Sequence, residues 1–216
     1  IAKIEKPEAI NNLNEIINSS DGVLVARGDL GVEMPLRDLP ILQKKIVNQC
    51  LKQKKPVIIA TQMLETMIEH PVPTRAEVND VANAIYDYAD AVMLSGETAI
   101  GKFPVETVKM MADIIISVEN DFVVENFNRL IETEKFRSND NRKSICHAAM
   151  TISNNLSINN IVIMTETGST ARTMAQYRPN ARIFALCPIP EICSQLTLIW
   201  GVIPILTKHF NTTDEM

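Results

Sequence analysis

Polar residues collect at the ends of four short apolar runs, and their types suggest chemistry on an anionic substrate. The four clusters are Lys3 and Glu5, Arg27-Gly28-Asp29, Thr61-Gln62, and Ser95-Gly96-Glu97-Thr98. If the runs are parallel strands, the clusters share one edge of a sheet, which is where parallel α/β barrels carry their active sites. Four clusters in succession therefore predict one site built from four strand ends.

Two carboxylates and a lysine in this set indicate metal-assisted chemistry on a phosphate or carboxylate group. Glu5 and Asp29 are hard oxygen ligands, and two carboxylates with water and substrate oxygens commonly hold Mg²⁺, or the similar Mn²⁺. Lys3 would share a strand face with Glu5 and stabilise negative charge that develops on an oxygen atom. Gly28 would let backbone N–H groups approach an anion closely.

Other interpretations of the same residues stay open. A structural ion pair between Lys3 and Glu5 explains their spacing equally well. Glu65 and Glu97 could be further metal ligands, although a role at a helix start or behind the ligands is favoured because Glu5 and Asp29 already suffice. The three histidines are scattered along the chain, and we assign them no catalytic role.

The elements that must position these residues are alternating strands and helices. The predicted strands are nearly continuous apolar runs, typical of strands buried on both faces of a parallel sheet. They are residues 1–5, 23–26, 57–60 and 91–94. The predicted helices are the amphipathic stretches 7–18, 39–54 and 75–88, and one from Pro104 to about residue 132. This order predicts parallel α/β architecture.

A second, smaller α/β domain is predicted after the polar residues 133–143. The predicted domains are therefore residues 1–132 and 133–216. Within the second domain we expect helices at residues 144–156, 170–177 and 189–198 and strands at residues 161–165, 183–186 and 202–206. Trp200 is expected to pack inside this domain.

Composition excludes several classes of protein. With 216 residues, of which 46% are hydrophobic and 22% charged, the chain has enough apolar material for a core, which excludes a disordered chain. No apolar run approaches the ~20 residues of a membrane-spanning helix. A net charge of −5 without a basic block excludes nucleic-acid binding. Four cysteines without CxxC spacing indicate reduced thiols and a cytoplasmic location.

Five segments resemble sequence blocks of the pyruvate kinase family, in the family's order and with similar spacing. They are Lys3-Ile4-Glu5, Val25-Ala26-Arg27-Gly28-Asp29-Leu30-Gly31, Ala60-Thr61-Gln62-Met63-Leu64-Glu65, Pro73-Thr74-Arg75-Ala76-Glu77 and Met93-Leu94-Ser95-Gly96-Glu97-Thr98-Ala99. The resemblance covers essentially the whole chain. It implies a glycolytic enzyme that transfers the phosphoryl group of phosphoenolpyruvate to ADP, giving pyruvate and ATP.

The resemblance also implies how the substrate and the metal are held. Lys3 would stabilise the phosphoryl group during its transfer. Glu5 and Asp29 would hold the Mg²⁺ that bridges the enzyme and phosphoenolpyruvate. Backbone groups of Ala26, Gly28 and Asp29 would receive the substrate carboxylate.

The remaining implied roles concern protonation, the subunit interface and cofactors. Thr61 would bind substrate beside the methylene carbon that is protonated, and Ser95 would belong to a water relay there. Arg27 lies in the substrate-binding block, and together with Arg75 it resembles arginines near the family's subunit interface. The family is tetrameric and uses K⁺, whose ligands would lie outside this chain.

A loop in the second domain resembles the family's regulatory phosphate site. Its residues are Thr165, Glu166, Thr167, Gly168, Ser169 and Thr170, between a predicted strand and a predicted helix. A hydroxyl-rich turn at a helix N-terminus can cradle a phosphate of a sugar bisphosphate activator. A carboxylate at Glu166 would repel that phosphate, so a capped helix start without a ligand is favoured.

The number of predicted strands limits the fold. A closed (β/α)₈ barrel needs eight strands and about 250 residues, whereas residues 1–118 supply four strand–helix units. We therefore expect the second half of a TIM barrel followed by a smaller α/β domain with a parallel sheet, a fragment that is inactive by itself. Two other functions are retained: another magnesium-dependent barrel enzyme acting on phosphoenolpyruvate or pyruvate, of the citrate lyase or mutase type, and a non-catalytic interaction module.

Overall fold

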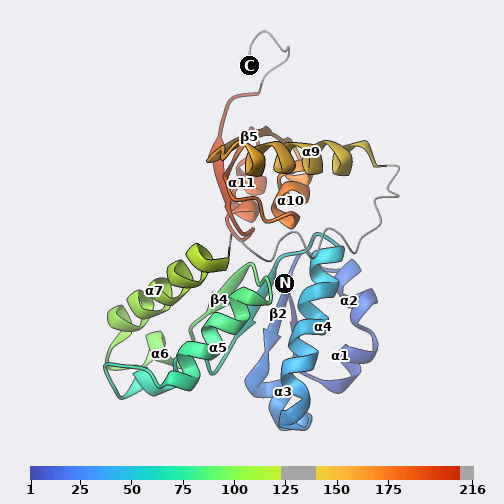
Figure 1. Ribbon diagram of the computed structural model, residues 1–216. Coiled ribbons are helices and arrows are strands. Elements are labelled where there is room, and N and C mark those ends of the chain that lie inside the picture. The colour runs from blue at the N-terminus through green and yellow to red at the C-terminus, as the bar shows by residue number, and fades with distance from the viewer. Residues whose placement is uncertain (123–139, 210–216) are drawn as a thin grey trace. The chain divides into compact units, whose positions relative to one another are not determined.

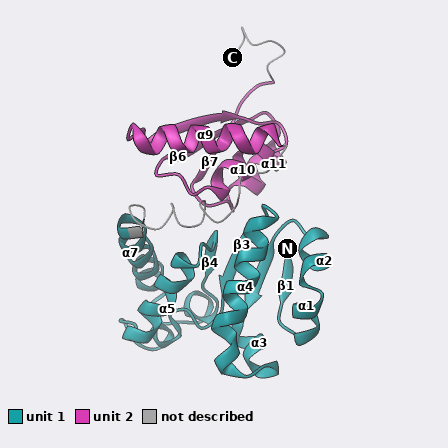
Figure 2. Cartoon of the chain, turned by 45° about the vertical axis from the view of Figure 1, so that its right-hand side comes forward, with its two compact units in different colours: residues 1–124 teal, residues 125–216 magenta. Residues whose placement is uncertain are grey.

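The computed structural model describes residues 1–122 and 140–209. The chain forms two compact units, Ile1–Val124 and Glu125–Met216, which are considered separately (Figure 2). The two α/β units predicted from the sequence are therefore present. Their predicted boundary, between residues 132 and 133, lies outside the described residues and stays a prediction.

The first unit is built on a four-stranded parallel sheet (Figure 1). Its strands are β1 (Ala2–Ile4), β2 (Val23–Ala26), β3 (Val57–Ala60) and β4 (Ala91–Met93). They pair in chain order, β1-β2-β3-β4, and every pair is parallel. Chain order without a reversal is the arrangement of barrel strands, and it brings the four carboxyl ends to one edge.

Helices follow each strand, largely where the amphipathic patterns predict them. They are α1 (Pro7–Asn11), α2 (Leu13–Asn18), α3 (Arg27–Glu33), α4 (Leu39–Lys52), α5 (Arg75–Tyr86), α6 (Gly96–Ala99) and α7 (Pro104–Phe122), with short 3₁₀ turns η1 (Leu36–Asp38) and η2 (Glu65–Ile68). Helix α4 packs on β2 and β3, and α5 packs along α7. The predicted continuation of the last helix to about residue 132 lies outside the described residues.

Two stretches differ from the expected pattern. The helix predicted over residues 7–18 divides at Asn12 into α1 and α2. The polar cluster Arg27-Gly28-Asp29, where no helix was predicted, forms the first turn of α3. A carboxylate in a first helical turn is favourable because it faces the positive end of the helix dipole, which suits Asp29 at this place.

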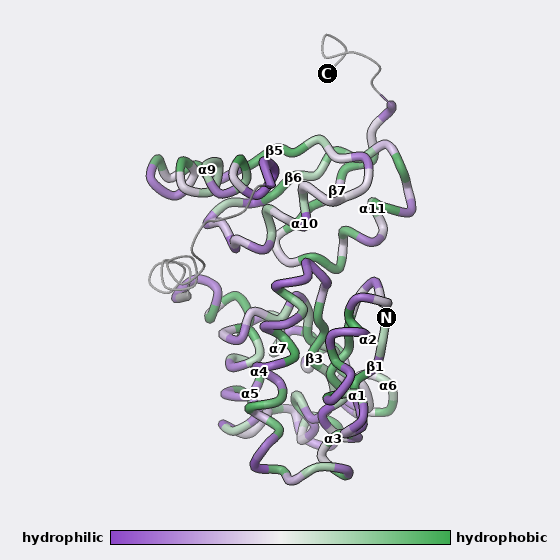
Figure 3. Tube along the Cα trace, turned by 90° about the vertical axis from the view of Figure 1, so that its right-hand side faces the viewer, coloured by the Kyte–Doolittle hydropathy of each residue, from purple (hydrophilic) through white to green (hydrophobic). Residues whose placement is uncertain are grey.

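The core of the first unit lies between the sheet and the helices. Ile4, Val25 and Ile59 are paired neighbours on adjacent strands, and all three are at most 1% exposed. Met63 and Leu64, directly after the polar end of β3, are also fully buried. Hydropathy along the chain follows this division, with hydrophobic segments along the strands (Figure 3). The segment after β3 is therefore anchored in the core just beyond its polar residues.

The second unit is a three-stranded parallel sheet with helices. Its strands β5 (Asn160–Met164), β6 (Arg182–Cys187) and β7 (Val202–Leu206) pair in that order. Its helices are α9 (Asn141–Asn155), α10 (Ser169–Gln176) and α11 (Pro190–Leu196). As predicted, Trp200 packs within this unit, where the Arg178 guanidinium lies 4.9 Å from its ring centroid.

Two further expectations concern the thiols and membranes. Cys50, Cys146, Cys187 and Cys193 are all free thiols, as predicted. Burial raises the pKa of the Cys50 thiol to about 12, so it stays protonated at neutral pH. No helix in the described parts of the chain is long and apolar enough to cross a membrane.

Helix α5 begins at a capping box. Thr74 Oγ1 accepts a hydrogen bond from the Glu77 N–H at 3.3 Å, and Glu77 Oε2 accepts one from the Thr74 N–H at 2.7 Å. Glu77 Oε1 also accepts a hydrogen bond from the Thr66 N–H at 2.6 Å. Glu77 thus joins the start of α5 to the 3₁₀ turn η2, satisfying N–H groups that lack helical partners.

We expect Thr74→Ala to lower the free energy of unfolding by about 1 kcal/mol, because the substitution removes the acceptor for a first-turn N–H. Chemical denaturation of the first unit would measure this. Asn83→Ala, at an exposed position within the same helix, is the matched control and should be neutral or slightly stabilising. Equal losses in both variants would contradict the capping role.

Glu77 also predicts a pH dependence. Burial raises the pKa of its carboxyl, but hydrogen bonds from Thr66 and Thr74 outweigh burial and hold the pKa below its ordinary value. Because the pKa of Glu77 is lower in the folded than in the unfolded protein, its ionised carboxylate stabilises the fold. This stabilisation is fully present at pH values above the unfolded pKa of about 4.3, and it is lost as the pH falls through the folded pKa. The difference in unfolding free energy between wild type and Glu77→Gln should therefore shrink from about pH 7 to about pH 3. Denaturation curves recorded over this pH range would measure the difference. If it stayed constant, the lowered pKa of Glu77 would not contribute to stability.

Candidate active site

The carboxyl ends of β1 and β2 bring together the three charged residues predicted to act on an anion. Lys3 Nζ lies 2.6 Å from Glu5 Oε2 and 2.8 Å from Asp29 Oδ2. The three side chains are 53%, 35% and 55% exposed, in that order. Two carboxylates from different strand ends thus converge on one cationic group that solvent can reach.

The charges in this cluster reinforce one another. Hydrogen bonds with Asp29 and then with Glu5 raise the pKa of Lys3 above its ordinary value, so the ammonium persists at neutral pH. The structural ion pair that the spacing left open therefore exists. Ion pairs at such exposure add little to stability, which favours a functional reason for gathering three charges here.

Other acidic groups do not join the cluster. Among the described residues, no three or more His, Cys, Asp or Glu side chains are grouped as a metal site. Glu97 is only 2% exposed, and its carboxylate accepts hydrogen bonds from the N–H groups of Leu64 at 3.3 Å and Ser95 at 2.7 Å. Glu97 thus ties the segment after β3 to the end of β4, at the start of helix α6. Glu65 is exposed at the start of η2.

The start of α3 contacts the end of β3 through Gly28 and Thr61. The Gly28 N–H donates a hydrogen bond of 2.7 Å to Thr61 Oγ1. A Cβ atom at residue 28 would lie 3.3 Å from that oxygen, closer than most side chains tolerate. A side chain at residue 28 would therefore require Thr61 to shift by a few tenths of an ångström.

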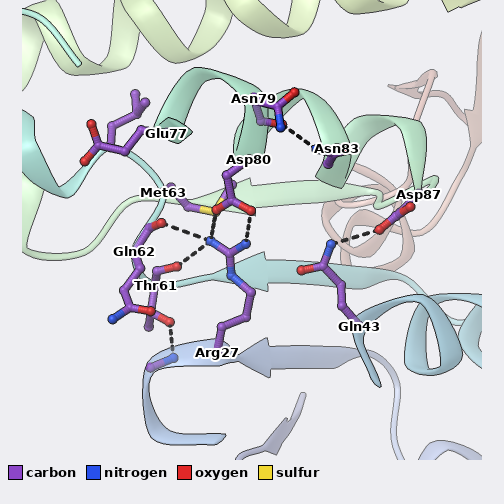
Figure 4. A network of polar contacts seen from close by, with 12 residues as sticks. Arg27, Gln43, Thr61, Gln62, Met63, Glu77, Asn79, Asp80, Asn83 and Asp87 are labelled. Atoms are coloured by element: carbon purple, nitrogen blue, oxygen red, sulfur yellow. Dashed lines mark hydrogen bonds and ion pairs between the residues drawn. The ribbon is translucent and has the colours of Figure 1, made fainter. Parts of the chain in front are cut away.

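Arg27 is 9% exposed, and its guanidinium is directed toward Asp80 and the segment after β3 (Figure 4). Its Nη1 donates to Asp80 Oδ1 at 2.7 Å, and its Nη2 lies 2.6 Å from Asp80 Oδ2. Nη2 also donates to the carbonyl oxygens of Thr61 at 2.7 Å and Gln62 at 3.1 Å. The structure thus joins Arg27 to the segment that carries Thr61.

Sequence reasoning missed two features of this site. Asp80, on α5, was not singled out, because its partner Arg27 lies 53 residues earlier and nothing local marks the pairing. The backbone of Thr61 and Gln62 is left-handed, with φ angles of 69° and 53°. Neither residue is a glycine or an asparagine, so composition gives no signal for it.

The loop that resembles the family's regulatory phosphate site leads into helix α10. Gly168 caps the helix with a φ of 75°, which a glycine adopts readily. Ser169 Oγ accepts a hydrogen bond from Arg142, and Glu166 Oε1 lies 3.4 Å from His209 Nε2. A basic group thus accompanies each end of the loop, while the Glu166 carboxylate remains 65% exposed. The regulatory role stays a prediction.

Comparison with known proteins adds to this geometry. Residues 1–108 match the family model described as "Pyruvate kinase, barrel domain", and residues 143–216 match "Pyruvate kinase, alpha/beta domain". The first match contains the four-stranded sheet with its polar edge, and the second contains the three-stranded sheet.

Individual relatives agree over the full length of this chain. It is 47% identical to a pyruvate kinase of Staphylococcus saprophyticus, and the match covers 100% of this chain and 36% of that protein. It is 49% identical to a pyruvate kinase of Methylorubrum extorquens, and that match covers 100% of this chain and 45% of the relative. The chain thus spans less than half the length of these relatives. This chain is also similar to the crystal structure of a pyruvate kinase from Cryptosporidium parvum, with 36% sequence identity and a TM-score of 0.91. That match covers 99% of this chain and 43% of the Cryptosporidium chain. With both of its α/β units matched in order by the two domain models, the chain belongs to the pyruvate kinase family.

Proposed function

We propose that this chain is part of an enzyme that transfers the phosphoryl group of phosphoenolpyruvate to ADP, with Mg²⁺ or Mn²⁺ as cofactor. The observation that carries the proposal is the convergence of Glu5 and Asp29 on Lys3 at the open edge of the parallel sheet. Phosphoryl transfer depends on positioning and on neutralising charge more than on covalent help from the protein. This cluster is suited to both.

The donor set fits a divalent cation. Glu5 and Asp29 each place an oxygen within 2.8 Å of one ammonium nitrogen, so both carboxylates already face a common cationic position. Both are accessible to solvent, and Mg²⁺ usually keeps several waters and binds one or two carboxylates together with substrate phosphates. A bound Mg²⁺ would polarise substrate oxygens and neutralise their charge.

Lys3 has a separate role. With Glu5 and Asp29 engaged by a metal, its ammonium would be released from them toward a phosphoryl oxygen. An ammonium in this position stabilises charge that develops only during transfer, so its effect falls on turnover. A lysine ammonium is charged at neutral pH even at its ordinary pKa, so the group keeps its charge when released.

The backbone at the start of α3 would bind the substrate carboxylate. Gly28 and Asp29 are in the first turn of α3, where N–H groups lack acceptors within the helix. The Gly28 N–H donates to Thr61 Oγ1, so a carboxylate bound there would share or replace that hydrogen bond. Ala26, the residue before this turn, completes the proposed carboxylate site. Thr61, whose hydroxyl accepts a hydrogen bond from Gly28, would lie next to the carbon that gains a proton, and Ser95 would relay water there.

Further features of the proposal rest on the family resemblance alone. They are a requirement for K⁺, a tetrameric assembly and a cytoplasmic location in glycolysis. Residues 165–170 resemble a regulatory phosphate site, but a capped helix start without a ligand is favoured there. The Glu166 carboxylate opposes phosphate binding at that loop.

The proposal is tested on the whole protein that contains this chain. Pyruvate formation from phosphoenolpyruvate and ADP would be followed in a coupled assay as Mg²⁺ is varied. Turnover that requires both substrates and the metal supports the proposal. Binding of the substrates without turnover would instead favour the non-catalytic module.

We expect Asp29→Asn to weaken Mg²⁺ binding and to lower turnover by about 100-fold or more, because it removes a charged ligand. Glu5→Gln should behave similarly. Mn²⁺ binding followed by electron paramagnetic resonance would measure affinity apart from activity. Glu33→Gln, exposed in the last turn of the same helix α3, is the control. Unchanged metal binding in both site variants would reject the assignment.

We expect Lys3→Met to lower turnover by about 100- to 1000-fold. Metal affinity should stay equal or become tighter, because the competing ammonium is removed from the two carboxylates. Steady-state kinetics and the same Mn²⁺ titration would separate the two effects. Lys6→Met, at an exposed lysine three residues later, should leave both quantities near wild type. A loss of metal affinity in Lys3→Met would contradict this division of roles.

A further inference from the structure

The backbone directly after β3 adopts a conformation that its residues do not favour. Thr61 and Gln62 have φ angles of 69° and 53°, in the left-handed region that side chains with a Cβ rarely occupy. For a β-branched residue such as Thr61 this conformation is especially unusual. Such strain persists only where surrounding contacts hold it, and it clusters at functional sites.

The contacts that hold this segment come from one buried guanidinium. Arg27 Nη2 donates to the carbonyl oxygens of both strained residues, Thr61 and Gln62, at 2.7 and 3.1 Å. The side chain of Arg27 is in turn paired with both carboxylate oxygens of Asp80, at 2.7 and 2.6 Å (Figure 4). Bidentate pairing fixes the plane of a guanidinium, so Asp80 sets the direction in which Arg27 donates.

The same segment is also held at its far end. Met63 and Leu64, which follow it, are fully buried, and the Leu64 N–H donates to the buried carboxylate of Glu97. Thr61 Oγ1 accepts a hydrogen bond from Gly28, the residue after Arg27. The orientation of the Thr61 hydroxyl is thus determined by groups on both of its sides.

We propose that the Arg27–Asp80 pair is a positioning device that holds the Thr61 hydroxyl beside the substrate site, and that the Arg27 side chain does not itself bind substrate. The inference rests on the proposed function and deepens it. Both terminal nitrogens of Arg27 are engaged by Asp80 and by the two carbonyl oxygens, and the side chain is 9% exposed. Its Nε, the remaining donor, is buried and has no partner among the described residues.

The proposal is tested by Arg27→Lys in the full-length protein. A lysine keeps the charge but lacks the planar pair of nitrogens that reaches Asp80 and two carbonyl oxygens together. We expect kcat to fall about 10- to 100-fold, the loss typical of a displaced reacting group, while KM for phosphoenolpyruvate changes less than about threefold. Asp80→Asn, which keeps the shape of the side chain, should shift kcat in the same direction. Arg37→Lys, at an exposed arginine next to Asp38, is the matched control.

A rescue variant separates positioning from direct binding. Glycine adopts left-handed angles readily, so the double variant Arg27→Lys/Gln62→Gly should have a kcat about fivefold higher than Arg27→Lys alone. If Arg27 instead bound substrate, KM would rise and glycine at residue 62 would restore nothing. Either of those results overturns the proposal.

Hydrogen exchange on the same full-length protein gives a readout that does not depend on turnover. In Arg27→Lys the Gly28 amide should exchange faster, because a released Thr61 no longer accepts its hydrogen bond. Arg37→Lys should leave that rate unchanged. If the wild-type protein transfers no phosphoryl group, the proposed function fails, while exchange at Gly28 still decides whether Arg27 holds Thr61. Unchanged exchange in Arg27→Lys overturns the positioning role.

Discussion

A buried guanidinium holds the ends of two neighbouring strands of the first unit in one arrangement. Arg27 leaves the end of β2 and donates to two carbonyl oxygens just beyond β3, with Asp80 of α5 as its counter-ion. Removing a charged group from water is costly unless it is paired and hydrogen-bonded. Because the partners of Arg27 come from separate parts of the chain, its burial is favourable only when all of them are in place. The geometry of this edge therefore depends on this one residue.

Polar contacts continue from this point across the whole carboxyl edge of the sheet. Lys3 after β1 pairs with Asp29 after β2, and the neighbouring Gly28 donates to Thr61 after β3. Glu97 then joins the segment after β3 to Ser95 after β4. The charged groups of Lys3 and Asp29 are exposed to solvent, whereas the Glu97 carboxylate, at the other end of this series of contacts, is buried. Such an arrangement leaves Lys3 and its carboxylates accessible while a fixed backbone supports them.

Left-handed backbone is stabilised in different ways at two places in the chain. In the second unit, the turn before α10 places Gly168 at a positive φ, and no neighbouring side chain is needed to hold it there. In the first unit, Thr61 and Gln62 adopt positive φ with full side chains and are held by Arg27. A hydroxyl is useful at residue 61 only if its orientation is fixed, and glycine would supply neither the hydroxyl nor the constraint.

Local patterns in the sequence were sufficient to predict the strands, most helices and the charged cluster. Residues 57–60 form a continuous apolar run and residues 75–88 an amphipathic stretch, and such patterns act between neighbours along the chain. Lys3, Glu5 and Asp29 were found because parallel strands end at one edge. The helical first turn at Arg27, the left-handed backbone at Thr61 and the pairing of Arg27 with Asp80 required the tertiary structure. The last two arise from contacts between residues that are 34 to 53 positions apart, and no local preference encodes such contacts.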